Sequence, residues 1–194
     1  MLSIFDSLRA VTMASITLRM LLSVLCGGLI GIEREYKRRP AGFRTHILIC
    51  LGAAMVSLTS QFLFLNMHYY LDVSRMSASV TAGIGFIGAG SIIVTRQQRV
   101  KGLTTAAGLW AAAIIGLAVG SGFYEGALLA TVLVLLAEAF LSKLEYWMMD
   151  HAPEINLYME YETRTAMDTV LQLLRAHRVT IQDMEITRPS GSED

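Results

Sequence analysis

Charged residues are scarce in this chain: Asp, Glu, Lys and Arg together make up 16% of its 194 residues. Apolar residues account for 54%, and the mean hydropathy is +0.50. A soluble domain carries about 25% charged residues, so the composition points towards a membrane protein. The charges that are present cluster in short loops and in the C-terminal tail, which argues against nucleic-acid binding.

Cysteine is scarce as well. Cys26 and Cys50 both lie in apolar runs, and no CxxC motif or His/Cys cluster accompanies them. The sequence therefore predicts neither a zinc site nor a disulfide framework, and we expect two buried thiols. It also has no Ser/His/Asp arrangement, no phosphate loop with Lys and no ATP site. We therefore expect a protein that is not an enzyme and that has no cofactor.

Long apolar runs are abundant instead. A helix needs about 20 apolar residues to cross a bilayer. Five segments approach this length: Ile16–Ile32, Ile47–Leu65, Met76–Thr95, Leu103–Val119 and Gly126–Trp147. The loops after the first and third segments are basic, which places them in the cytoplasm. The prediction is an all-α polytopic membrane domain over residues 1–148, with about five transmembrane helices, an external N-terminus and a cytoplasmic C-terminus.

Residues 149–194 differ in kind. Ile155–Tyr161 alternates apolar and polar residues like a strand, Thr165–His177 has helical spacing, and Val179–Ile186 is a second strand candidate. This order predicts a cytoplasmic βαβ tail, which is half of a ferredoxin-like or ACT-like unit. So short a segment does not complete that unit. Either two copies complete each other in a dimer, or the tail is truncated and partly disordered.

Glycine is frequent in the apolar segments. Small residues let membrane helices approach closely, because hydrophobic drive between helices is weak in lipid. We therefore expect helix packing and homo-oligomer contacts at Gly27, Gly31, Gly83, Gly85, Gly88, Gly90, Gly116 and Gly120. The run from Gly83 to Gly88 matches GxGxxG but lacks the strand–turn–helix context of a dinucleotide site. A smooth packing ridge of Ala78, Ala82, Gly85 and Ala89 is one interpretation, and a broken helix that lines a transport site is the other.

Polar residues near the apolar segments are the candidates for function. Glu138 is the only acid within an apolar run, and ionisable groups at depth are functional candidates, although nearby Lys143 also allows a shallow position. Arg19 is expected to extend to the interface. Thr104 or Thr105 is expected to cap its helix. Alternatively, that helix N-terminus holds an anion such as a lipid phosphate, together with Arg96, Arg99 and Lys101.

Four motifs in order then resemble those of the MgtC/SapB family of bacterial inner-membrane proteins, over roughly residues 16–145. They are GIERE (31–35), AGFRTH (41–46), GIGFIGAG (83–90) and VKGLTTAA (100–107), followed by Trp110. The resemblance implies a role in growth at low magnesium and, in some pathogens, in survival inside macrophages. For a member of the MgtC type, the resemblance would also imply restraint of the F1Fo ATP synthase. This chain departs from such members at Ser79, at Thr104 and in its shorter tail, which weighs against that partner.

The sequence thus predicts a non-enzymatic regulator of a membrane complex or of ion homeostasis, acting during adaptation to low magnesium or acid stress. By resemblance, the functional residues are Glu33, Arg34, Arg44, Thr45, Arg75, Thr104, Thr105 and Trp110. The alternative is a transporter or channel for a small ion or solute. Its path would be lined by Ser79, Thr81, Ser91, Thr104 and Thr105, with Glu138 nearby. A third hypothesis is a protein that binds membrane lipid through the basic residues before Leu103.

Overall fold

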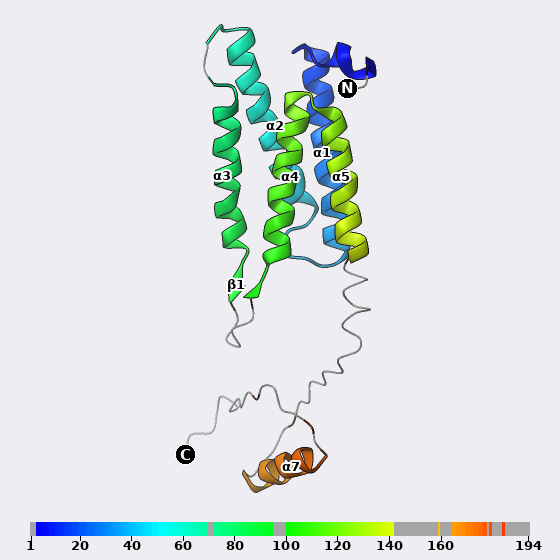
Figure 1. The fold of residues 1–194 in the computed structure, drawn as a ribbon, viewed down its shortest axis with the longest axis vertical. Helices are drawn as coiled ribbons and strands as arrows, with labels where there is room; N and C mark the ends of the chain where they lie inside the picture. The colour runs from blue at the N-terminus through cyan, green and yellow to red at the C-terminus, as the bar shows by residue number, and fades with distance from the viewer. Residues whose placement is uncertain are drawn as a thin grey trace. The chain divides into compact units, whose positions relative to one another are not determined.

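The computed structural model describes residues 3–69, 72–94, 100–141, 159, 164–177, 179 and 184. The chain divides into two compact units, Met1–His151 and Ala152–Asp194. The first unit is a bundle of helices that run alternately up and down (Figure 1). Its elements are the 3-10 helix η1 (Ser3–Leu8), α1 (Met13–Tyr36), α2 (Phe43–Leu65), α3 (Ser74–Gly90), β1 (Ile93–Val94), β2 (Val100–Lys101), α4 (Leu103–Ser121), α5 (Tyr124–Leu136) and the π-helical segment η2 (Ala137–Leu141).

Helix α1 shows why this bundle belongs in a membrane. Its buried residues include Ser15, Arg19 and Ser23. From Met13 to Ile32, its exposed large side chains are apolar: Met13, Leu18, Leu21, Leu25, Leu29 and Ile32. This is the reverse of a soluble amphipathic helix, which hides its apolar face. Helices α1, α2 and α4 are each long and apolar enough to cross a bilayer. The chain is therefore a mostly helical membrane protein.

Helix α1 is longer than the sequence predicts. It begins at Met13, where Thr12 and Ser15 form a reciprocal capping box, and it continues to Tyr36 instead of ending at Ile32. An ion pair between Glu33 and Lys37, one turn apart, stabilises the added turn. Glu33 and the adjacent Arg34 were expected in a loop at the membrane surface. They lie in the helix instead.

The third predicted segment ends early. Helix α3 stops at Gly90, whereas the sequence predicted a helix to Thr95, and β1 then pairs antiparallel with β2. Gly102, with φ of 98°, makes the corner between β2 and α4, and a Cβ there would overlap the main-chain oxygen of Ser91. Gly102 is the N-cap of α4 and no side chain caps this helix, so the prediction of a threonine cap is wrong.

Glycine sets the spacing of α1, α2 and α4. A Cβ at Gly27 would lie 2.6 Å from the His46 oxygen, and one at Gly31 would lie 2.7 Å from the Phe43 Cα. At Gly116 and Gly120, a Cβ would overlap main-chain oxygens of α2. The three helices therefore touch backbone to backbone. The core beside these contacts consists of Cys26, Ile30, Cys50, Ile115, Val119 and Ala127.

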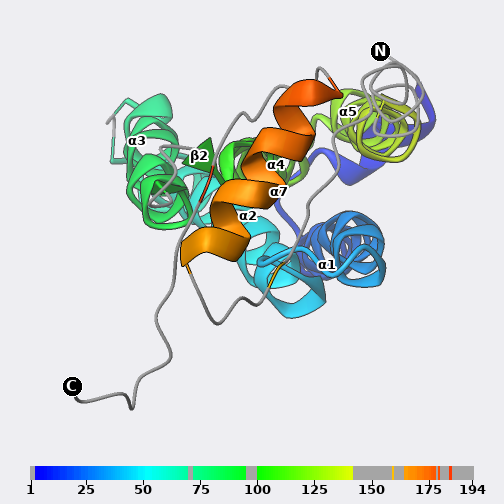
Figure 2. The same ribbon diagram turned by 90° about the horizontal axis from the view of Figure 1, so that it is seen from below.

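Helix α3 packs differently. It lies at the edge of the bundle beside α2 and α4 (Figure 2). Only Ile84 and Gly88 of this helix are buried, and Gly88 faces Ala106 of α4. A Cβ at Gly83, Gly85 or Gly90 would meet no atom within 4 Å. The ridge predicted from the sequence is exposed at all four positions: Ala78, Ala82, Gly85 and Ala89. Helix α3 is continuous, and this ridge faces away from the bundle.

In the second unit the structure describes mainly α7 (Arg164–Ala176). This is the helix predicted over Thr165–His177. The two strand candidates, Ile155–Tyr161 and Val179–Ile186, fall on segments of which only single residues are described.

Candidate functional site

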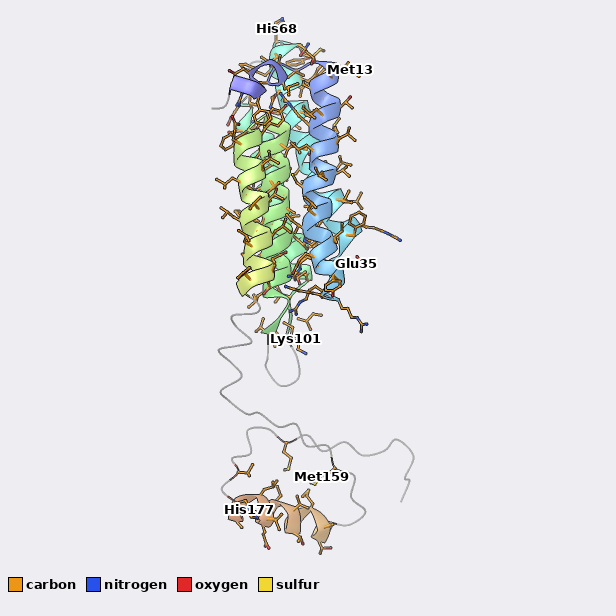
Figure 3. All side chains as sticks on the ribbon, turned by 90° about the vertical axis from the view of Figure 1, so that its right-hand side faces the viewer. Met13, Glu35, His68, Lys101, Met159 and His177 are labelled. Atoms are coloured by element: carbon orange, nitrogen blue, oxygen red, sulfur yellow. The ribbon has the colours of Figure 1, made fainter. Side chains whose placement is uncertain are left out.

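The two ends of the bundle differ in charge. Glu35 and Lys101 lie at one end, and Met13 and His68 lie at the other (Figure 3). We call the first the basic end, because its loops and helix termini carry Lys37, Arg38, Arg39, Arg44 and Lys101. By the positive-inside rule, this end corresponds to the cytoplasmic surface.

A set of buried and half-buried polar side chains lies just inside the basic end. We call it the charge cluster, and its members are Glu33, Arg34, Lys37, His46, Thr105 and Glu138. Helix α1 supplies Glu33 and Arg34, its C-cap residue is Lys37, and α2, α4 and η2 supply one member each. Four helices thus meet where charged groups are removed from water. Such groups are costly to bury unless they are paired.

Arg34 is the centre of the charge cluster. Its side chain is 4% exposed, and Nη1 lies 3.6 Å from Oε1 of Glu138, whose side chain is 8% exposed. Its Nη2 donates a hydrogen bond to Oγ1 of Thr105 at 3.3 Å. Arg34 therefore links α1 to both α4 and η2. Such an ion pair affects stability mainly because removal of one partner leaves the other charge buried and without that ion pair.

Lys37 lies at the edge of the charge cluster, where the loop between α1 and α2 begins. Its Nζ lies 2.5 Å from Oε1 of Glu33 and donates to the main-chain oxygen of Glu138 at 2.5 Å. A π-helical segment changes the hydrogen-bond pattern of a helix from i→i+4 to i→i+5, and such segments are frequent at functional sites. Here η2 presents both the side chain and the carbonyl of Glu138 to α1.

His46 approaches the cluster from α2 and is fully buried. Its Nδ1 lies 3.0 Å from the main-chain oxygen of Gly42, so Nδ1–H is the donor. A Cβ at Gly108 of α4 would come within 2.9 Å of Glu138 Oε1 and 3.7 Å of His46 Nε2. Gly108 thus provides the space in which the two side chains approach each other.

The structure brings together some of the residues that the sequence singled out and separates others. Glu33, Arg34, Thr105 and Glu138 meet in the charge cluster. Trp110 and Thr104 are exposed on α4. Arg44 is exposed at the start of α2, next to Thr45. Together with Ile32, Glu35, Tyr36 and Phe43, Arg44 lines an open groove of about 500 Å³.

Arg75 lies at the opposite end of the bundle, exposed in the first turn of α3. Nearby Asp72 accepts hydrogen bonds from the main-chain N–H and the hydroxyl of Ser74, at 2.9 and 2.7 Å. These bonds hold the pKa of the Asp72 carboxyl below its usual value. They order the turn that leads into α3.

The residues proposed for a transport path are not gathered along one line. The hydroxyls of Ser79, Thr81 and Ser91 donate to main-chain oxygens of α3 itself, whereas Thr105 and Glu138 contact Arg34. Of the three basic residues proposed to hold a lipid phosphate, Lys101 is exposed in β2. Arg96 and Arg99 lie outside the described residues.

Sequence reasoning missed Lys37 and His46. Lys37 was identifiable as the residue four positions after Glu33, a spacing that favours an ion pair on a helix. His46 is the last residue of the AGFRTH motif, but its burial depends on the close contact of α1 with α2 at Gly27. That tertiary contact cannot be read from one motif.

A second buried network closes the opposite end of the bundle. Arg19 is fully buried. Its guanidinium donates to the hydroxyl of Tyr124, the side-chain oxygen of Gln61 and the main-chain oxygens of Leu8, Arg9 and Gly120, at 2.7–3.3 Å. The prediction that Arg19 extends to the interface is wrong, because the bundle itself supplies an acceptor for each of its five N–H groups.

We expect Arg34→Leu to lower the free energy of unfolding by about 3 kcal/mol, because it leaves buried Glu138 without the ion pair that Arg34 provides. The control is Arg44→Leu at the exposed start of α2, for which we expect a change within about 0.5 kcal/mol. Both are measured by unfolding in mixed micelles, followed by circular dichroism. Equal losses in the two variants would contradict the placement of Arg34.

A sequence model described as the MgtC family matches residues 20–147. The chain is 40% identical to the "Putative magnesium transporter YhiD" of Escherichia coli K12, over 93% of this chain and 91% of that protein. It is 32% identical to "Protein SapB" of Bacillus subtilis, over 87% and 78%. It is 40% identical to "Protein MgtC" of Salmonella typhimurium LT2, over 64% of this chain and 51% of that protein. No solved structure matches.

Proposed function

This chain belongs to the MgtC family, and on that premise we propose that it is a non-enzymatic regulator in the bacterial inner membrane. In this role it adjusts ion homeostasis or the activity of a membrane complex during adaptation to low magnesium or acid stress. The names of its relatives support the link to magnesium, since YhiD is called a putative magnesium transporter. The proposal places regulation ahead of transport because of how the bundle is packed.

The observation that carries the proposal is that side chains fill the interior of the bundle from the Arg19 network at one end to the charge cluster at the other. Between the Arg19 network and the charge cluster, the core is mainly apolar, the buried hydroxyls of Ser23 and Thr131 donate to main-chain oxygens of their own helices, and α2 and α4 touch at Gly116 and Gly120. An ion that crossed this core would lose its hydration without gaining ligands, at a cost of several kcal/mol or more. A bundle packed in this way favours a protein that binds other proteins over a protein that conducts ions through its own core.

We propose that α3 and α5 also cross the bilayer, which gives five spans with the basic end in the cytoplasm. Helix α3 has 17 residues, which at about 1.5 Å per residue spans most of a hydrocarbon core about 30 Å thick. Both helices run alongside the three longer ones (Figure 1). A reporter fused after Tyr69 is expected to be external, and one fused after Lys101 is expected to be cytoplasmic.

For the regulator, we propose two interaction surfaces. The basic end presents exposed cations to a partner complex or to anionic lipid: Arg38, Arg39, Arg44 and Lys101. The exposed small-residue ridge of α3 fits a second copy of the chain. The shared location of the family motifs 31–35 and 41–46 at the basic end supports a role for this surface.

Transport is the second candidate function. It is favoured by the printed name of YhiD and by the exposed ridge of α3, which in an oligomer lines the space between copies. In that arrangement the path lies outside the single bundle. Substituting a ridge residue with a large side chain then blocks conduction without disturbing the core.

The test is flux through the purified protein in liposomes, followed with indicators of Mg²⁺, K⁺ and H⁺. We expect no flux above that of empty liposomes, while an added ionophore confirms that each indicator responds. Flux that is present in the wild type and lost in Gly85→Leu would overturn regulation and make α3 a conduction element. Without flux, the next step is co-purification of a membrane complex, compared between the wild type and Arg44→Ala.

A further inference from the structure

An open groove of about 500 Å³ lies between the end of α1 and the start of α2, at the basic end of the bundle. Its lining residues are Ile32, Glu35, Tyr36, Phe43 and Arg44. All five are exposed, and none of them belongs to the charge cluster. Ligand sites in proteins are usually concave, with apolar walls and a few polar groups that orient the ligand. This groove combines aliphatic and aromatic side chains with one cation and one carboxylate, so it is a candidate binding site of its own.

Close packing of α1 against α2 fixes the walls of the groove. A Cβ at Gly31 would lie 2.7 Å from the Phe43 Cα, and one at Gly28 would lie 3.2 Å from Cε2 of the Phe43 ring. The N–H of Phe43 also donates to Oε2 of Glu35 at 2.8 Å, which ties the first turn of α2 to the last turn of α1. Phe43 is therefore held against α1 through both its main chain and its ring. The groove is preformed in the single bundle, so a ligand does not need to open it.

The apolar wall of the groove continues the membrane-facing surface of α1. Leu25, Leu29, Ile32 and Tyr36 follow one another at spacings of four, three and four residues, so they form one stripe along the helix. All four side chains are exposed. In a bilayer, an exposed aliphatic stripe contacts acyl chains, and an aromatic residue at its end is typical of the headgroup level. An acyl chain that packs along this stripe therefore reaches the groove.

Arg44 gives the groove a positive charge that the bundle leaves uncompensated. Its side chain is exposed, and among the residues that the structure describes it has no ion pair and no hydrogen-bonded partner. The carboxylate of Glu35 bonds to the Phe43 N–H instead. The loop that joins the two walls adds Arg38 and Arg39, which are both exposed. This excess of arginine favours an anionic ligand, and a guanidinium binds a phosphate through two parallel N–H bonds.

We propose that the groove binds an anionic phospholipid, with the lipid phosphate at Arg44 and one acyl chain along the stripe that ends at Ile32 and Tyr36. A transmembrane helix of a partner protein would also cover the apolar wall, but an apolar helix brings no charge to Arg44. A free anion would meet Arg44 but would leave the apolar wall uncovered. An anionic phospholipid supplies both parts. The inference deepens the role of the basic end, and it rests on the proposed function only for the cytoplasmic position of that end.

The test is native mass spectrometry of the delipidated full chain in detergent, titrated with phosphatidylglycerol and, separately, with phosphatidylcholine of the same acyl chains. We expect the first phosphatidylglycerol to bind more tightly than the first phosphatidylcholine. Arg44→Gln is expected to lower the phosphatidylglycerol affinity about fivefold, the usual contribution of one basic residue to the binding of anionic lipid. Phosphatidylcholine binding should not change. Inorganic phosphate should not compete, because it has no acyl chain to place along the stripe.

Two further variants make the test specific to the groove. Arg75→Gln removes an exposed arginine at the opposite end of the bundle, and we expect it to leave the affinity unchanged. Glu35→Gln removes the negative charge of the groove but keeps an oxygen that can accept from the Phe43 N–H, so it should strengthen phosphatidylglycerol binding. A merely structural role of these side chains would instead weaken binding in both Arg44→Gln and Glu35→Gln.

Three results would overturn the proposal. Equal affinities of the wild type for the two lipids would favour a partner helix on the apolar wall. Equal losses in Arg44→Gln and Arg75→Gln would show that binding follows the overall charge and not the groove. Competition by inorganic phosphate would make the groove an anion site and not a lipid site. None of these results depends on the flux measurement, which decides between regulation and transport.

Discussion

Gly116→Ala is expected to destabilise the protein strongly, because it adds a methyl group where α2 and α4 touch. A Cβ at this position overlaps the main-chain oxygen of Cys50 and lies 3.0 Å from the Ala53 side chain, so α2 and α4 must separate. Overpacking of a close contact costs about 1–3 kcal/mol, and a backbone neighbour that cannot rotate away places this variant at the upper end of that range. The measurement is unfolding in mixed micelles, followed by loss of helicity.

The matched control is the same substitution on α3. Gly85→Ala adds a methyl group where no atom lies within 4 Å, so we expect no destabilisation of the monomer and a gain of about 0.5–1 kcal/mol from the higher helix propensity of alanine. Gly120→Ala, whose Cβ overlaps the Ala54 oxygen, should behave like Gly116→Ala. If Gly85→Ala were as damaging as Gly116→Ala, α3 would have a close partner that the single bundle does not provide. That result would support an oligomer through the ridge of α3.

Arg19→Leu is expected to lower the free energy of unfolding by about 3–5 kcal/mol, because it removes five hydrogen bonds and a buried acceptor left without a donor costs about 1–3 kcal/mol. The change removes one donor from each of the main-chain oxygens of Leu8, Arg9 and Gly120. Leu8 still accepts from the Tyr124 hydroxyl, and Gly120 still accepts from the Gln61 amide. Because the carbonyls of Leu8 and Arg9 lie just before α1, the N-terminal segment should also detach. Limited proteolysis near η1 measures that second effect.

The control at the same end is Arg75→Leu, an exposed arginine in the first turn of α3. We expect it to change stability by less than about 0.5 kcal/mol and to leave the proteolysis pattern unchanged. Arg19→Lys keeps the charge but has three donors in place of five. Its loss of unfolding free energy should therefore fall between that of Arg75→Leu and that of Arg19→Leu. An Arg19→Leu protein as stable as the wild type would contradict the buried position of this side chain.

The membrane class and the order of the helices could be predicted because long apolar runs and basic loops are local signals. The family assignment could also be predicted, since its motifs are contiguous stretches. Helix boundaries were less accurate where a specific contact decides them. The Glu33–Lys37 pair extends α1, and the positive φ of Gly102 accommodates the turn from a two-stranded hairpin into α4.

The charge cluster could be predicted only in part. Glu33, Arg34, Thr105 and Glu138 were each singled out from the sequence, but their contact depends on three helix interfaces and on the π-helical turn at Glu138. Arg19 shows the same limit. A lone arginine near a helix end fits a side chain that extends to the interface, and only the fold shows that five acceptors surround it.

The most direct test of the account is the accessibility of the chain's two cysteines, since the account rests on an apolar core closed at both ends. Cys26 and Cys50 are 1% and 0% exposed and lie in that core. A charged, water-soluble methanethiosulfonate is added to intact membranes, with Ser121→Cys as an exposed positive control. The account predicts labelling of neither native thiol until the protein is unfolded in SDS. Labelling of Cys26 or Cys50 in the folded protein would show that water reaches the core and would contradict the closed bundle.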